Sequence, residues 1–172
     1  IGQEYLTGKD GIITKMIENN HLQSFVLYGG PGTGKTTIGK IIKEMYSLES
    51  YEFNASSDSK AILQEITNLT KFYPNVILII DEIHRKKDTQ DYLLPYLEDG
   101  RITIIGLTTS NPYISINKAI RSRLNIYQMN SITEKDIVNL LKRTIKLDEF
   151  KDLQIDDEVL KLIANMSGCE IR

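Results

Sequence analysis

Short runs of aliphatic and aromatic residues alternate along this chain with longer segments in which apolar residues recur every three or four positions. The short runs are typical of strands, and the longer spacing is typical of helices that bury one face. The expected strands are 25–28, 50–54, 76–80, 102–107 and 124–128. The expected helices are 10–19, 35–46, 59–71, 88–98, 115–123, 133–146 and 156–166. This alternation predicts an α/β fold, with a five-stranded parallel sheet flanked by helices.

The strand pattern ends near residue 130, and only helical patterns follow it. Thr133 stands where a helix cap is expected, and the acidic residues at 156–158 would meet the positive end of the last helix. We therefore expect a core domain over residues 1–129 and the start of a small helical lid over residues 130–172.

Composition and charge exclude several classes of protein. The chain has 172 residues, 41% of them hydrophobic, and a net charge of −2, which gives no overall electrostatic attraction for nucleic acid. Its single cysteine, Cys169, excludes an internal disulfide, and its distant histidines, His21 and His84, make a zinc site unexpected. No long apolar run or signal-like start is present, so we expect an intracellular, cytoplasmic protein without membrane contact. Because the chain opens at Ile1 and not at methionine, we also expect a fragment.

The most specific motif follows the first expected strand. Residues 28–37 read YGGPGTGKTT and fit the phosphate-binding pattern G-x-x-x-x-G-K-[ST], between a strand and a helix as this motif requires. Its glycines let backbone amides converge on a phosphate, and the helix that follows adds the positive end of its dipole. ATP is therefore the expected cofactor. The residues expected to contact it are Gly30, Pro31, Gly32, Thr33, Gly34, Lys35, Thr36 and Thr37.

A second motif indicates hydrolysis as well as binding. The aliphatic run at 76–80 reads as a strand buried on both faces, and Asp81 and Glu82 follow it at the edge where parallel sheets bind ligands. Lys35 is expected to bridge the β- and γ-phosphates, while Thr36 and Asp81 hold Mg²⁺. Glu82 is then expected to polarise the attacking water.

Several segments together resemble a known family. They are IGQ at the start, GGPGTGKTT at 29–37, DEIHR at 81–85, ITIIGLTTSNP at 102–112 and the pair Ser122-Arg123. This combination resembles the AAA+ ATPases of the clamp-loader branch, and within it the replication-associated recombination protein A family (RarA or MgsA, with the Werner-helicase-interacting protein as relative). Residues 81–123 carry most of that resemblance. It implies a P-loop AAA+ core followed by a truncated lid, with the family's C-terminal oligomerisation region absent.

The resemblance implies further roles around the nucleotide. In this family the first residues line the adenine pocket, which makes Ile1, Gly2, Gln3 and also Leu6 candidates for that contact. A polar residue after the strand at 102–107 acts as sensor 1 and touches the γ-phosphate or the water. We favour Thr109 for this role, while Thr108 and Asn111 remain alternatives.

Two arginines complete the implied site. Arg123 of the Ser-Arg pair resembles the arginine finger that enters the ATP site of a neighbouring subunit, and Arg121 lies close enough in sequence to be confused with it. Arg172 resembles the sensor 2 arginine of the lid. There Cys169 and Glu170 replace the usual glycine and aspartate, so the match is weaker.

Two further departures from the family pattern bear on function. Gly30 stands where most relatives have proline, which loosens the loop but leaves its phosphate contacts available. Residues 54–58 read NASSD and look more like the corresponding segment of sliding-clamp loaders.

The function implied by the resemblance is a DNA-dependent ATPase of replication-fork maintenance, recombination and repair that hydrolyses ATP at subunit interfaces. Its implied partners are DNA ends, gaps or forks, single-strand DNA-binding protein and further copies of the chain, at the nucleoid. The alternatives are a sliding-clamp-loader subunit, a Holliday-junction branch-migration motor and an ATP-binding subunit that never turns over. Against the last, Lys35, Asp81, Glu82 and Arg123 are all present.

Overall fold

The computed structural model describes residues 1–73, 75–150 and 155–168. Its centre is a five-stranded parallel sheet in the order β2-β3-β4-β1-β5. The strands are β1 (Phe25–Tyr28), β2 (Ser50–Asn54), β3 (Val76–Asp81), β4 (Ile102–Thr108) and β5 (Asn125–Gln128). The predicted fold class is therefore confirmed, and each strand lies within one residue of its expected bounds.

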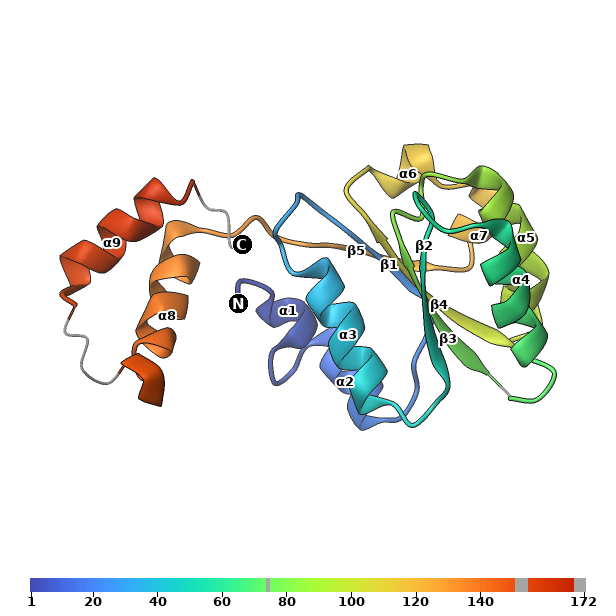
Figure 1. The fold of residues 1–172 in the computed structure, drawn as a ribbon, viewed down its shortest axis with the longest axis horizontal. Coiled ribbons are helices and arrows are strands. Elements are labelled where there is room, and N and C mark those ends of the chain that lie inside the picture. Colours follow the sequence, from blue (N-terminus) through green and yellow to red (C-terminus); the bar gives the residue numbers. More distant parts are fainter. Residues whose placement is uncertain (74, 151–154, 169–172) are drawn as a thin grey trace.

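Helices cover both faces of the sheet (Figure 1). One face carries α1 (Glu4–Thr7), α2 (Ile12–Glu18) and α3 (Lys35–Met45), and the other carries α4 (Lys60–Leu69), α5 (Lys87–Glu98) and α7 (Lys118–Arg121). Alternate residues of β3 explain this arrangement. Leu78 and Ile80 are fully buried against α4 and α5, while Ile77 and Ile79 pack with Ile38 toward α3. A strand buried on both faces must be apolar throughout, as the sequence pattern required.

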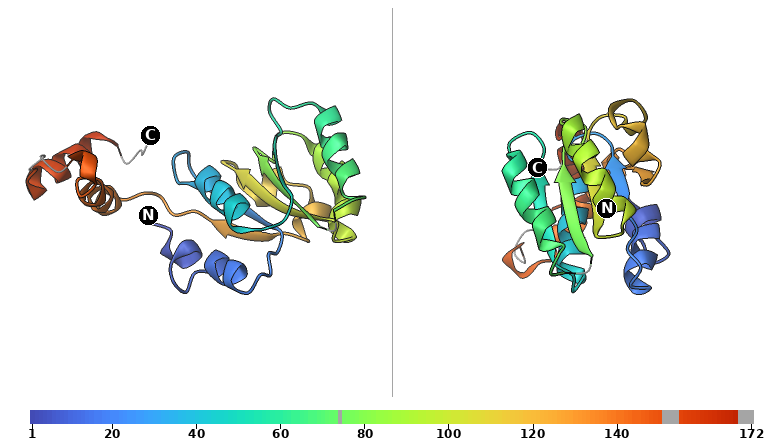
Figure 2. Two further views of the ribbon diagram at one scale, coloured as in Figure 1. Left: turned by 60° about the horizontal axis from the view of Figure 1, so that its bottom comes forward. Right: turned by 90° about the vertical axis from the view of Figure 1, so that its right-hand side faces the viewer.

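The helical part at the end of the chain has its own small core. After β5 an extended connection leads to α8 (Glu134–Thr144), the short helix η1 (Asp148–Phe150) and α9 (Asp157–Met166), which stand apart from the sheet (Figure 2). Ile132, Ile137 and Ala164 form that core. Thr133 caps α8 as expected, in a reciprocal pair of hydrogen bonds with Asp136. The Thr133 hydroxyl and backbone N–H both donate to the Asp136 carboxylate, which lowers the pKa of that carboxyl. The division of the chain at residue 129 stays a prediction.

Two expected helices differ from those observed. The segment expected at 10–19 contains only α2, and α1 precedes it. The two are separated by a turn in which a side chain at Gly8 or Gly11 would lie 2.4 Å from a backbone carbonyl oxygen. The segment expected at 115–123 is divided into α6 (Pro112–Ser115) and α7, because Ile116 is extended and buried in the core. Among the described residues, no helix is both long and apolar enough to cross a membrane.

Candidate nucleotide site

The glycine-rich loop lies between the end of β1 and the start of α3, at the carboxyl edge of the sheet. Gly34 precedes α3 with φ +94° and Gly32 has φ +75°, values that favour glycine. A side chain at Gly29 would lie 2.8 Å from Cβ of Met129, so close approach of the chain after β5 requires glycine there. At Gly30 nothing lies within 4 Å of the place where a side chain would begin, so close packing does not require glycine there.

Lys35 spans the mouth of this loop. Its ammonium group donates hydrogen bonds to the carbonyl oxygens of Gly29 and Gly30, at 2.8 and 2.7 Å. Burial lowers the pKa of Lys35, while the nearby carboxylates of Glu82 and Asp81 oppose that shift. The arrangement holds a largely desolvated cation beside the amides that would receive phosphate.

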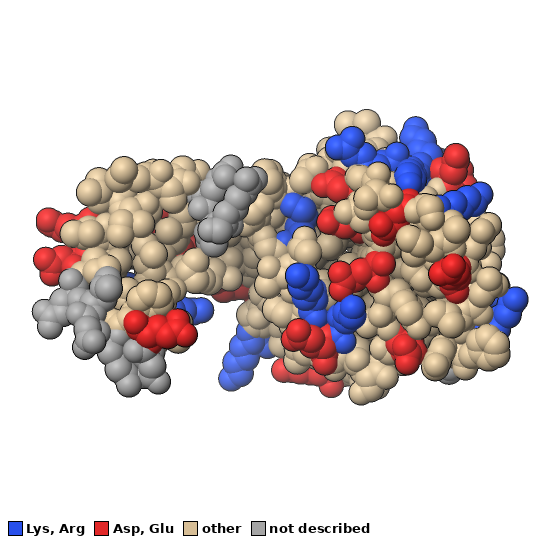
Figure 3. Space-filling view, viewed as in Figure 1, with Lys and Arg blue, Asp and Glu red and all other residues tan. Residues whose placement is uncertain are grey.

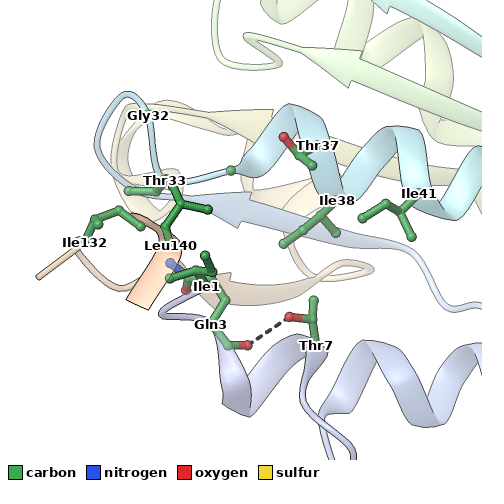
Figure 4. Close-up of a pocket in the computed structure, with 11 residues that line it drawn as sticks. Ile1, Gln3, Thr7, Gly32, Thr33, Thr37, Ile38, Ile41, Ile132 and Leu140 are labelled. Carbon is green, nitrogen blue, oxygen red and sulfur yellow. Dashed lines mark hydrogen bonds between the residues drawn. The ribbon is translucent and has the colours of Figure 1, made fainter. Parts of the chain in front are cut away.

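A cavity of about 300 Å³ opens beside the loop (Figure 4). Its walls come from the N-terminal segment, from the loop with α3, and from the start of the helical part. The lining residues are Ile1, Gln3, Thr7, Gly32, Thr33, Gly34, Thr37, Ile38, Ile41, Ile132 and Leu140. Aliphatic side chains dominate it, which suits a flat aromatic ring next to the phosphate loop. Ile132 and Leu140 could not be predicted from the sequence, because their distance along the chain from the loop gives no signal of proximity.

The four candidates for the adenine contact lie in different places. Ile1 and Gln3 line the cavity. The amide of Gln3 is bound to the backbone of Asn130 by two hydrogen bonds, of 2.9 and 3.0 Å, which hold the N-terminal segment against the chain after β5. Gly2 is not a lining residue and has φ +73° beside Asp136, and Leu6 is fully buried in the core. Their contact with a nucleotide stays a prediction.

Thr36 and Asp81 line a second hollow, between α3 and the ends of β2 and β3, where Asn54 and Asp58 complete the polar wall. Among the described residues, no group of three or more histidines, cysteines or carboxylates gathers to hold a metal. A cation at Thr36 and Asp81 would therefore share its coordination with phosphate oxygens and water. That is how Mg²⁺ is usually held beside a nucleotide.

Glu82 has an unusual backbone. Its φ is +52°, which is rare for a residue with a side chain. The carbonyl of Asp81 accepts from Ala55 N, and Ile83 N donates to Leu107 O at 3.1 Å, so Glu82 is looped out between two fixed neighbours. Such strain costs about 1–3 kcal/mol and is concentrated at functional sites. The loop directs the Glu82 side chain toward His84, whose Nδ1 lies 3.1 Å from Glu82 Oε2.

The three sensor 1 candidates have different surroundings. Thr108 is buried at the end of β4, with its hydroxyl 2.8 Å from His84 Nδ1. Asn111 caps α6 by accepting from Tyr113 N. Thr109 is exposed. From the sequence, His84 was weighed only as a zinc ligand, although the DEIH segment places it two residues after Glu82.

Arg123 lies at the opposite, amino edge of the sheet. It stands two residues before β5, which pairs in parallel with β1 so that Phe25 faces Asn125 and Tyr28 faces Gln128. At about 3.3 Å per residue, it is roughly 20 Å from the start of the phosphate loop. Its guanidinium donates to Ala119 O at 2.7 Å and lies 2.5 Å from Glu98 Oε1.

Arg121 and Arg172 are the other two arginines considered for the site. The Arg121 guanidinium donates to the carbonyl of Tyr113 and lies 5.7 Å from the centre of that ring, so it fastens α6 to α7. Arg172, with Cys169 and Glu170, lies outside the described residues, and its role stays a prediction.

Fold and site together define a P-loop ATPase domain, and the family comparison agrees. The model of the "ATPase family associated with various cellular activities (AAA)" matches residues 25–131. The chain belongs to this AAA family of ATPases, and the predictions of an ATPase and of nucleotide binding are confirmed at that level.

Within the family, the chain is similar to replication and recombination proteins. It is 41% identical over 178 residues to the replication-associated recombination protein A of Bacillus subtilis (strain 168). That alignment covers the whole of this chain and 42% of the Bacillus protein. It is 37% identical to ATPase WRNIP1 of Dictyostelium discoideum, across the whole chain and 20% of that protein. The resemblance inferred from the motifs is confirmed. The chain spans less than half the length of these relatives.

A solved structure with the same fold is the Holliday junction branch migration motor RuvB of Thermotoga maritima. It superposes with a TM-score of 0.79 over 99% of this chain and 58% of that one, at 26% sequence identity. That identity is lower than the 41% shared with the recombination protein, so RuvB is the more distant of the two comparisons.

Proposed function

We propose that this chain is the ATP-hydrolysing domain of a DNA-dependent ATPase of the RarA type, acting in replication-fork maintenance, recombination and repair. The observation that carries this proposal is the division of the catalytic groups between two edges of the sheet. Lys35, Asp81 and Glu82 lie at the carboxyl edge, and Arg123 lies at the amino edge. A second copy would have to bring its Arg123 to the first copy's phosphates, so hydrolysis takes place at subunit interfaces.

Each group at the carboxyl edge has a role that its position supports. Lys35 and the loop amides bind the β- and γ-phosphates, and Thr36 and Asp81 hold Mg²⁺. Bound there, Mg²⁺ neutralises charge on the phosphate oxygens. Glu82 positions the attacking water, and Thr109 senses the γ-phosphate because it is exposed, whereas Thr108 and Asn111 already have hydrogen-bond partners. In the same scheme Arg172 of the lid contacts the γ-phosphate in cis.

DNA is the proposed macromolecular partner, as ends, gaps or forks. Support comes from the names of the relatives and from a local gathering of basic side chains over α6 and the start of α5 (Figure 3). Lys86 there donates to the carbonyl of Asp58 at 2.6 Å, while Arg85 and Lys87 are exposed. Single-strand DNA-binding protein, a homo-oligomer and a cytoplasmic, nucleoid-associated location belong to the same proposal.

Steady-state ATP hydrolysis by the full-length protein tests this function. We expect a rate per subunit that rises with protein concentration, because Arg123 acts in trans, and that rises further with gapped or blunt-ended DNA. Glu82→Gln should keep ATP bound while turnover falls by roughly 100-fold or more, since the group that orients water is lost. Asp88→Asn, an exposed carboxylate at the start of α5, is the matched control.

Several results would contradict the proposal. Normal turnover by Glu82→Gln would overturn its role. A rate that ignores both concentration and DNA would favour a clamp-loader or non-hydrolysing assembly subunit. The similarity to RuvB makes a branch-migration motor the second candidate, and stimulation only by four-way junctions, from a hexamer, would favour it.

A further inference from the structure

Three side chains from two neighbouring strand ends meet beside the expected position of the attacking water. His84 Nδ1 lies 2.8 Å from the hydroxyl of Thr108 and 3.1 Å from Oε2 of Glu82. Oε2 is buried and, although within ion-pair distance of His84, has no aligned hydrogen bond with any described residue. A single ring nitrogen therefore faces two oxygens, and one of these belongs to the proposed catalytic carboxylate.

The two contacts are chemical alternatives. Nδ1 of a neutral imidazole carries either a hydrogen or a lone pair. With the hydrogen there, a small rotation of the ring lets it donate to Glu82, and the Thr108 hydroxyl turns to the Ser110 carbonyl, 3.4 Å away. With the lone pair there, Nδ1 accepts from Thr108 and repels the carboxylate.

We propose that His84 is a positioning residue for hydrolysis, whose Nδ1 holds Oε2 of Glu82 so that Oε1 faces the attacking water. This rests on the proposed role of Glu82. Thr108 competes for the same nitrogen from the end of β4, the strand that also leads to Thr109. A displacement of that strand end would therefore change how firmly Glu82 is held, and so how well it orients water.

A buried carboxylate oxygen that lacks an aligned partner among the described residues is costly, which argues that the contact with His84 is used. The backbone of Glu82 is fixed by its neighbours, so its side chain is the part that remains to be oriented. His84 is only 15% exposed at the side chain and leaves little room for water to replace it.

The test is a set of His84 variants in the full-length protein, with kcat and KM for ATP measured together with nucleotide affinity. His84→Leu should lower kcat by roughly 10- to 100-fold, the scale of a misplaced catalytic group, with KM and affinity within about twofold. His84→Asn should recover most of kcat, because its amide nitrogen occupies the place of Nδ1, whereas the longer His84→Gln should not. His21→Leu, at the exposed other histidine, is the control.

The Glu82→Gln variant distinguishes failure of this inference from failure of the proposed function. If Glu82→Gln turns over normally, the proposed function itself falls. If Glu82→Gln is inactive while His84→Leu keeps wild-type kcat, only the role of His84 is overturned. Equal loss in the Leu, Asn and Gln variants, with a lower melting temperature in each, would also overturn it, because a packing role predicts that pattern.

Discussion

The two edges of the parallel sheet carry different kinds of functional group. At the carboxyl edge, Lys35, Glu82 and Thr108 contact partners from neighbouring loops and strands, around the proposed positions of phosphate, metal and water. At the amino edge, the polar partners of the Arg123 guanidinium within the described part of the chain are Glu98, Ala119 and Ser122. In the proposed mechanism, the carboxyl edge thus provides most of the hydrolytic groups, while the amino edge provides the arginine finger, Arg123. This difference is the basis of our proposal that each half acts together with the other half of a second copy.

Gln90 is a physical link between the two halves. Its buried amide donates to Ile83 O, next to Glu82, and accepts from Asn117 N, just before the helix that leads to Arg123, both at 2.8 Å. A movement of the loop after β3 would therefore act, through the hydrogen bonds of Gln90, on the segment that leads to Arg123.

The largest expected effect comes from removing the cation of the carboxyl edge. Lys35→Ala should weaken ATP binding by at least about 100-fold, because a charge-assisted contact with two phosphates is lost together with the group that spans the loop. Titration with a fluorescent ATP analogue measures it. Lys40→Ala, exposed on the same helix, should bind normally. Tight ATP binding by Lys35→Ala would show that Lys35 does not bind the phosphates, and would overturn the assignment of the carboxyl edge as the nucleotide site.

The next effect concerns the amino edge. Arg123→Ala should bind ATP normally but lose roughly 1,000-fold in hydrolysis within the assembled protein, the lower range for arginine fingers. Mixing it with Lys35→Ala should restore part of the rate, since the first supplies intact sites and the second intact arginines. Arg101→Ala, at a half-buried arginine that precedes β4 at the same edge, is the control. If the mixture stays inactive, the two edges do not act on each other across an interface.

Much of this division could be predicted from the sequence. An uninterrupted aliphatic run identified β3, because a doubly covered parallel strand has no polar face. The spacing of Gly29, Gly34, Lys35 and Thr36 between a strand and a helix identified the phosphate loop. Contacts between distant segments could not be predicted. Gln3 binds Asn130, 127 residues away, and neither residue belongs to a periodic pattern. The contact of His84 with Thr108 was not predicted, because His84 follows β3 whereas Thr108 ends β4, and the sequence does not show that these two points meet.

The ion pair of Arg123 with Glu98 offers the finest test of the comparison. Both side chains are more than 40% exposed, so the pair contributes about 0.2–1 kcal/mol and must be broken before the arginine can reach a phosphate across an interface. Glu98→Gln should therefore raise hydrolysis at a fixed, subsaturating protein concentration by up to roughly fivefold, with unchanged ATP affinity. Asp99→Asn, which removes the neighbouring pair with Arg101, should have no effect. A lower rate in Glu98→Gln would mean instead that Glu98 holds Arg123 in its active orientation. The amino edge, like the carboxyl edge, would then be ordered by contacts within its own chain.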